Sequence, residues 1–107
     1  MEQRIKAIMD ILDLNKAEDI EVFDLSSKGY VVNQVVIATA RNNKHSFALL
    51  DHLRKGLKPL GEEFLRTEEE DGEWIIIDLG DIFIHLMTQN MRDKYTLEDF
   101  LTHFQPA

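Results

Sequence analysis

Two apolar runs separated by a glycine and an aspartate place the strongest constraint on how this chain folds. Residues 74–79 and 82–87 are rich in isoleucine and other β-prone side chains, and only Gly80 and Asp81 separate them. A two-residue loop joins antiparallel strands, and glycine at its first position suits a type II′ turn, which needs a positive φ there. The sequence therefore predicts a β-hairpin over residues 74–87.

The residues before this hairpin predict a helix, two strands and a second helix. The opening residues have the apolar spacing of an amphipathic helix, and a short strand over residues 20–25 and a polar turn follow. A second strand is predicted over residues 30–40, where β-branched residues without alternation indicate a central strand covered on both faces. Asn42 or Asn43 then begins a helix that closes at Pro59.

Three further segments complete the predicted fold. Residues 63–66 form a short segment ahead of the hairpin, and a polar loop follows the hairpin. Residues 96–99 then resemble a capping box, with Asp99 in place of the usual glutamate, at the start of a short C-terminal helix. This order of helices and strands predicts an α/β fold that is α+β-like. Residues 1–107 form a single domain, with a mixed five-stranded sheet flanked by helices.

The charge of the chain is strongly negative and unevenly distributed. Twelve basic and 20 acidic residues give a net charge of -8. Residues 60–107 carry 3 of the basic and 12 of the acidic residues. This balance disfavours direct binding of nucleic acid through phosphate contacts. It favours a basic partner that approaches the second half of the chain.

Composition also limits the chemistry and the compartment. There is no cysteine, so the chain has neither a disulfide framework nor a thiol nucleophile, and a reducing compartment such as the cytoplasm is expected. No run of about 20 apolar residues predicts a membrane span. His45 and His52 are seven residues apart on the predicted helix, but no third zinc ligand is evident.

Nine residues from Trp74 onward stand at the spacing of a known family. They are Trp74, Asp78, Gly80, Asp81, His85, Arg92, Tyr95, Leu97 and Glu98. This pattern, W-x-x-x-D-x-G-D-x-x-x-H followed by R-x-x-Y-x-L-E, resembles the ribosomal silencing factor (RsfS, or Iojap) family. The resemblance extends over almost the whole chain. Departures lie around Asn33, Gln34, Ala40 and Asn42.

The resemblance implies a nucleotidyltransferase-like fold and a regulatory function. The family binds the large ribosomal subunit through its protein fourteen, sterically blocks subunit joining and represses translation under nutrient limitation. It has no catalytic residues and requires no cofactor or metal.

Seven residues are the candidates for partner binding: Trp74, Ile75, Asp78, Asp81, His85, Arg92 and Tyr95. Each also has a structural interpretation. Trp74 suits either an interface anchor or a half-buried position at the sheet end. His85 is expected to pack near the Trp74 strand, with a carboxylate as one possible partner. Arg92 and Tyr95 either tie the C-terminal helix to the sheet or face the partner.

Two other functions stay open as alternatives. Asp78 and Asp81 would hold Mg²⁺ in a divergent nucleotidyl or phosphoryl transferase, but the Gly-Ser phosphate loop and the D-x-D carboxylate pair of such enzymes are missing. Turn chemistry is the structural interpretation of the same pair. The third possibility is a self-associating adaptor, in which an apolar sheet edge pairs two copies as a homodimer of the free protein.

Overall fold

The predicted hairpin lies inside a five-stranded sheet in the computed structural model, which describes residues 2–104. Its strands are β4 (Trp74–Asp78) and β5 (Ile82–Thr88), and they pair antiparallel. Gly80 has a φ of 99° in the turn between them. A positive φ is the conformation for which glycine has no steric penalty, so the local sequence signal and the observed turn agree.

The complete sheet has the strand order β1-β2-β5-β4-β3. The three remaining strands are β1 (Glu18–Asp24), β2 (Gln34–Ala40) and β3 (Arg66–Glu68). β2 and β5 run parallel, and the other neighbouring pairs are antiparallel. The prediction of a mixed five-stranded sheet is therefore confirmed. The buried β2 and β5 lie in its middle.

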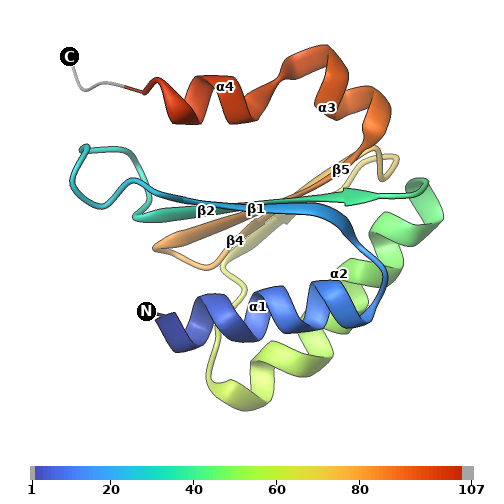
Figure 1. Ribbon diagram of the computed structural model, residues 1–107. Helices are drawn as coiled ribbons and strands as arrows, with labels where there is room; N and C mark the ends of the chain where they lie inside the picture. The colour runs from blue at the N-terminus through green and yellow to red at the C-terminus, as the bar shows by residue number, and fades with distance from the viewer. Residues whose placement is uncertain (1, 105–107) are drawn as a thin grey trace.

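Helices cover both faces of this sheet (Figure 1). Helices α1 (Glu2–Leu14) and α2 (Asn43–Leu57) pack on one face, and a short 3₁₀ helix, η1 (Lys58–Leu60), follows α2. Helices α3 (Gln89–Tyr95) and α4 (Leu97–Thr102) lie on the opposite face. In residues 2–104, no helix combines the length and apolar character needed to cross a membrane.

The start of α2 follows the sequence signal closely. Asn42 is the N-cap, and its side chain accepts a hydrogen bond from the backbone N–H of His45 at 2.8 Å. His45 in turn joins this helix start to the end of α1, because its Nε2 lies 2.8 Å from the carbonyl oxygen of Asn15. This contact gives His45 a structural role.

Two predictions near the edges of the elements are wrong. Residues 30–33 are a loop, because the β1–β2 connection closes where Leu25 donates its backbone N–H to the Asn33 carbonyl. Residues 89–95, predicted as a polar loop, form α3, whose buried Arg92 gives this polar helix an anchor in the interior. Tertiary contacts therefore decide both segments.

The predicted capping box at residues 96–99 is also absent. Thr96 has a φ of 40° and makes no side-chain hydrogen bond to the start of α4. It serves instead as the left-handed C-cap of α3, where its backbone N–H donates to the Arg92 carbonyl. One residue therefore ends one helix and begins the next.

Candidate docking surface

One half of a sheet face carries no helix. Helices α3 and α4 pack over β1, β2 and the end of β5, through Met91, Leu97 and Leu101. Among residues 2–104, no helix covers the side chains of β3 and β4 that point the same way, except at Trp74, which packs against Tyr95 of α3. We call this region the open sheet face and define it by Arg66, Glu68, Trp74, Ile76, Asp78, Phe83 and His85.

The strand register arranges these side chains in rows. Glu68, Ile76 and His85 lie opposite one another on β3, β4 and β5. The next row contains Arg66, Asp78 and Phe83. Together with Tyr30 these two rows line a hollow of about 200 Å³. The open sheet face is thus concave, with apolar residues in the middle and charged residues toward β3.

Trp74 and His85 are joined across the hairpin. The indole Nε1 of Trp74 donates a hydrogen bond to Nδ1 of His85 at 2.9 Å. Trp74 is paired with Met87 in the register, so His85 is its diagonal neighbour on the same face. The prediction that His85 packs near the Trp74 strand is confirmed, but its partner is the indole and not a carboxylate.

The imidazole of His85 is buried and neutral. His85 is 7% exposed, and loss of solvent around its ring lowers the pKa of His85 to about 4. Because Nδ1 accepts the indole N–H, the single proton of the neutral ring resides on Nε2. The hydrogen bond therefore fixes both the charge and the tautomer of His85.

Tyr95 extends the aromatic surface beyond Trp74. The two ring centroids are 5.2 Å apart, and Tyr95 is 49% exposed at the end of α3. A second hollow, of about 250 Å³, lies beside this pair, and its acidic lining residues are Glu68, Glu70, Asp71 and Glu73. Two aromatic rings are thus placed next to a rim of four carboxylates. We call these four residues the acidic rim.

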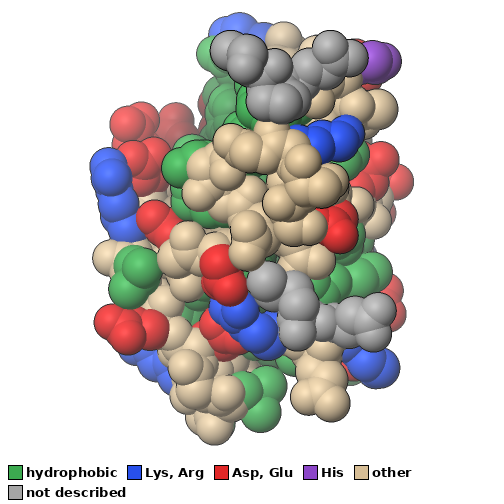
Figure 2. All heavy atoms as spheres, turned by 90° about the vertical axis from the view of Figure 1, so that its left-hand side faces the viewer, with side chains coloured by type: hydrophobic (Ala, Val, Ile, Leu, Met, Phe, Trp, Pro, Cys, Tyr) green, Lys and Arg blue, Asp and Glu red, His purple; other side chains and the backbone are tan. Residues whose placement is uncertain are grey.

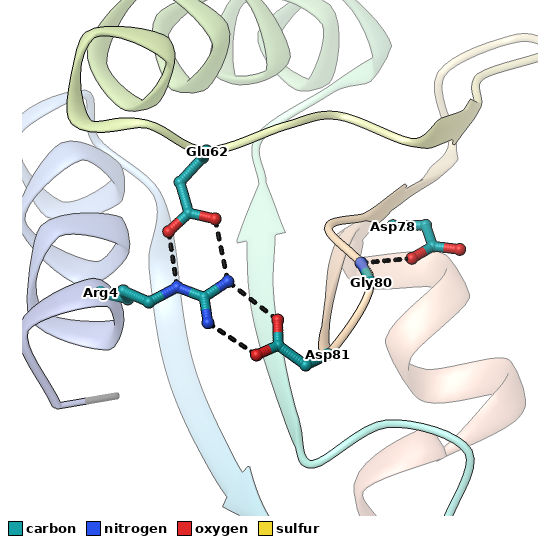
Figure 3. Close-up of polar contacts among 5 residues, drawn as sticks. All are labelled: Arg4, Glu62, Asp78, Gly80 and Asp81. Atoms are coloured by element: carbon teal, nitrogen blue, oxygen red, sulfur yellow. Dashed lines mark hydrogen bonds and ion pairs between the residues drawn. The ribbon is translucent and has the colours of Figure 1, made fainter.

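Asp78 and Asp81 bind different groups (Figure 3). Asp78 accepts the backbone N–H of Gly80 at 2.7 Å. Asp81 accepts two hydrogen bonds from Arg4 at 2.7 and 2.8 Å, and Arg4 also donates to Glu62. The Arg4 guanidinium lowers the pKa of the Asp81 carboxyl. Turn chemistry is therefore confirmed for Asp78, whereas Asp81 ties the turn to α1.

The geometry of Asp78 and Asp81 does not support the transferase alternative, which requires the two carboxylates to share a metal ion. The two carboxylates point toward separate partners in Figure 3. In the part of the chain that the structure describes, no three His, Asp or Glu side chains are grouped so that they could hold a metal ion.

Three of the seven candidates have buried side chains in this conformation: Ile75, Arg92 and His85. Ile75 is fully buried on the opposite face of β4, among the residues that pack against α1 and α2. Arg92 is 6% exposed. It donates to the hydroxyl of Thr39 at 2.9 Å and also binds the Asp19 carbonyl and the Glu21 carboxylate. Ile75 and Arg92 therefore make structural contacts in this conformation, and their part in partner binding stays a prediction.

The open sheet face also contains residues that the sequence prediction missed. Ile76, Phe83 and Arg66 lie on it, and Tyr30 borders the hollow. The alternation of a strand held the signal, because residues two apart share a face and Trp74 and Asp78 therefore bracket Ile76. Tyr30 had no such signal, since it reaches the hollow from a loop.

The distribution of charge at one end of the molecule agrees with the acidic composition. Figure 2 shows the end of the molecule that lies on the left in Figure 1, where the β1–β2 loop and the C-terminal end of α4 are found. On this face the blue basic side chains of the described residues are scattered, and red acidic side chains lie beside several of them. The described residues at this end therefore form no extended basic patch of the kind that binds phosphates.

Comparison with known proteins identifies relatives over nearly the full chain. The family model "Ribosomal silencing factor during starvation" matches residues 1–105. The ribosomal silencing factor RsfS of Haemophilus influenzae is 30% identical over 95 residues, which cover 88% of this chain and 93% of that protein. That of Chromobacterium violaceum is 33% identical over 95 residues, covering 88% and 75%.

Solved structures agree with these sequence relatives. A crystal structure of a Chromobacterium violaceum protein has a TM-score of 0.89 at 28% identity, covering 99% of this chain and 89% of that one. A Bacillus halodurans protein has a TM-score of 0.82 at 25% identity, covering 94% of each chain. The matched family model, the sequence relatives and the shared fold together show that this chain belongs to the ribosomal silencing factor family.

Proposed function

We propose that this protein represses translation under nutrient limitation by docking the open sheet face on protein fourteen of the large ribosomal subunit. Docking there blocks joining of the small subunit. Membership of the silencing factor family supports a ribosomal target. A mouse relative, 28% identical over 102 residues, is named for mitochondrial assembly of the large ribosomal subunit, which supports the choice of subunit. The proposed place of action is the cytoplasm.

The observation that carries this proposal is the aromatic pair beside the acidic rim. Trp74 and Tyr95 lie against each other where the end of α3 meets the open sheet face. Tryptophan and tyrosine are enriched among the residues that dominate binding energy. The acidic rim complements a basic ribosomal protein and would speed its approach. Aromatic anchors and acidic rim together suit a basic protein surface.

The proposed mechanism is steric and needs no reaction. The molecule measures 37 × 33 × 22 Å, so a copy bound between the subunits would fill space that the small subunit must occupy. Of the seven candidate residues, Trp74, Asp78 and Tyr95 lie at the open sheet face or its border, and we assign them to partner contact. Asp81, which binds Arg4 of α1, stays a candidate at the adjoining turn. His85 lies directly beneath Trp74.

Co-sedimentation with purified large subunits at low salt tests this proposal. The protein should pellet with large subunits and not with small subunits. In excess, it should also slow the formation of joined ribosomes from the two subunits, measured by light scattering. Normal joining in the presence of saturating protein would overturn the proposal.

Removal of the tryptophan ring tests the docking surface itself. Trp74→Ala should weaken binding to large subunits by about 2 kcal/mol or more, which is a loss of about 30-fold in Kd, because a hot-spot ring is lost. Leu14→Ala is the matched control, since Leu14 is 79% exposed on α1 and lies on the other side of the sheet. A folded Trp74→Ala variant that binds normally would move the docking surface elsewhere.

Self-association of the free protein stays a separate prediction. A homodimer would raise the mass with concentration in sedimentation velocity experiments. Constant monomer mass up to high concentration would remove the adaptor alternative.

A further inference from the structure

We propose that His85 is a positioning residue of the docking surface, which holds the Trp74 indole in its docking orientation by accepting the indole N–H. This inference rests on the proposed function, because it assigns His85 a role in the docking of Trp74. It separates His85 from the residues that touch the partner.

Trp74 is partly buried at the edge of the hydrophobic cluster under α3 and α4, and its indole N–H donates to His85. Trp74 is the first residue of β4 and lies next to the loop that carries Glu70, Asp71 and Glu73 of the acidic rim. Its ring packs against Tyr95, which is itself half exposed at the end of a short helix. The hydrogen bond to His85 reaches instead into β5, a strand whose neighbours pair with it on both sides. The directional contact of the indole is therefore the one made by the histidine.

Indole chemistry makes this contact directional. The indole N–H is a donor with no acceptor function, and one ring nitrogen of a neutral imidazole is its natural acceptor. Nδ1 occupies that position at 2.9 Å. A ring tied at its N–H cannot turn about the Cβ–Cγ bond without losing the hydrogen bond. His85 therefore reduces the number of orientations that Trp74 must give up on binding, which is the usual benefit of preorganisation.

Two substitutions separate the acceptor from the volume of the side chain. Asparagine places its carbonyl oxygen at the same number of bonds from Cβ as Nδ1 of histidine, so His85→Asn keeps an acceptor near the indole. His85→Leu keeps apolar volume and removes the acceptor. His85→Phe gives a second ring without nitrogen and replaces His85→Leu if that variant does not fold, as judged by circular dichroism.

The free protein is examined first, by NMR. Trp74 is the only tryptophan in the chain, so a ¹H–¹⁵N spectrum contains one indole N–H signal. Wild type and His85→Asn should show a downfield signal that exchanges slowly with solvent. In His85→Leu the signal should move upfield and exchange at least about tenfold faster, as expected when a hydrogen bond of ordinary strength is lost. An unchanged signal in folded His85→Leu would overturn the inference.

Docking is examined next, with large ribosomal subunits as the probe. His85→Leu should bind about tenfold more weakly than wild type, while His85→Asn should stay within about threefold. Leu14→Ala again serves as the control. If His85→Leu releases the indole and still binds like wild type, the positioning role is wrong while the proposed function stands. If wild type itself fails to bind, the proposed function is overturned and the docking role of His85 with it.

Discussion

The two faces of the β4–β5 hairpin differ sharply although the same strands build them. On the face under α1 and α2, Ile75, Ile77, Ile82, Ile84 and Leu86 have no exposed surface. On the other face the alternating residues are Trp74, Ile76, Asp78, Phe83, His85 and Met87, of which only His85 and Met87 are buried. We call the first the closed sheet face. The comparison shows that β-prone residues alone do not create a core, because a helix must also cover them.

The difference arises from where the helices end. Arg92 binds groups on β1 and β2, and this draws α3 and α4 toward that side of the sheet. The β3 and β4 half is left without a helix and offers a concave apolar surface. Such surfaces are typical of interaction sites. Arg92 therefore contributes to docking indirectly, through the placement of α3 and α4.

Truncation of one isoleucine on each face gives the largest expected contrast. Ile77→Ala should lower the free energy of unfolding by about 2–5 kcal/mol, since it leaves a cavity in the closed sheet face. Ile76→Ala should lower it by about 1 kcal/mol or less, because its partly exposed side chain loses less contact. Urea denaturation monitored by circular dichroism measures both. Equal losses would contradict the contrast.

Acid should weaken the fold through a group on the open sheet face. The pKa of His85 is about 4 in the folded protein and 6.5 in an ordinary environment. Between these values the unfolded chain binds more protons, so stability is complete above pH 6.5 and declines as the pH falls toward 4. The free energy of unfolding should fall by about 3 kcal/mol in total.

The measurement is urea unfolding at several pH values for wild type and His85→Asn. The lowered pKa of Asp81 acts in the same direction in both proteins, so the difference between them isolates His85. If the difference in free energy of unfolding between wild type and His85→Asn is the same at pH 7 and pH 4.5, His85 is not buried as a neutral ring.

The ion pair between α1 and the hairpin turn should have a smaller effect. Asp81→Asn should lower the free energy of unfolding by about 1 kcal/mol, because the Arg4 and Asp81 side chains are 32% and 38% exposed and solvent screens them. High salt should reduce the difference between wild type and variant. Asp78→Asn is the control, since asparagine can still accept the Gly80 N–H. An equal loss for Asp78→Asn would argue that turn geometry dominates.

The acidic rim should have the smallest effect on stability and a visible effect on association. Neutralising Glu70, Asp71 and Glu73 to their amides should change the free energy of unfolding by about 0.5 kcal/mol or less. The same variant should bind large subunits more slowly at low salt, because rim charges act mainly on approach. The control variant has Asp10, Asp13 and Asp51 changed to asparagine. These changes lie on α1 and α2 and give the control the same net charge as the rim variant. Equal on-rates for the two variants, measured by stopped flow, would contradict steering by the rim.

Local sequence signals were sufficient to predict a feature where the residues that form it are close together in the chain. Gly80 and Asp81 specify a two-residue turn because glycine accepts a positive φ. Asn42 marks the start of α2 because its short side chain accepts a helix N–H. Strand alternation also places Trp74 and Asp78 on one face. These features depend on residues a few positions apart, so a single sequence can reveal them.

The roles of the signature residues needed the tertiary structure. Spacing alone could not tell that Arg92 is buried by β1 and β2, or that Asp81 pairs with Arg4, 77 positions away. It could not tell that α3 forms, since its anchor comes from other elements. In each case the partner is distant in the chain, and the choice of partner depends on how the layers pack.

The amino-acid sequence by itself determined the hairpin, the mixed sheet and the family, because these follow from local propensity and from a spaced set of residues. The tertiary structure alone decided which of those residues face solvent. It joined Trp74 to His85 and left half of one sheet face without a helix. The physical reason is that exposure depends on which elements cover a face, and coverage is set by contacts between parts of the chain that no local pattern connects.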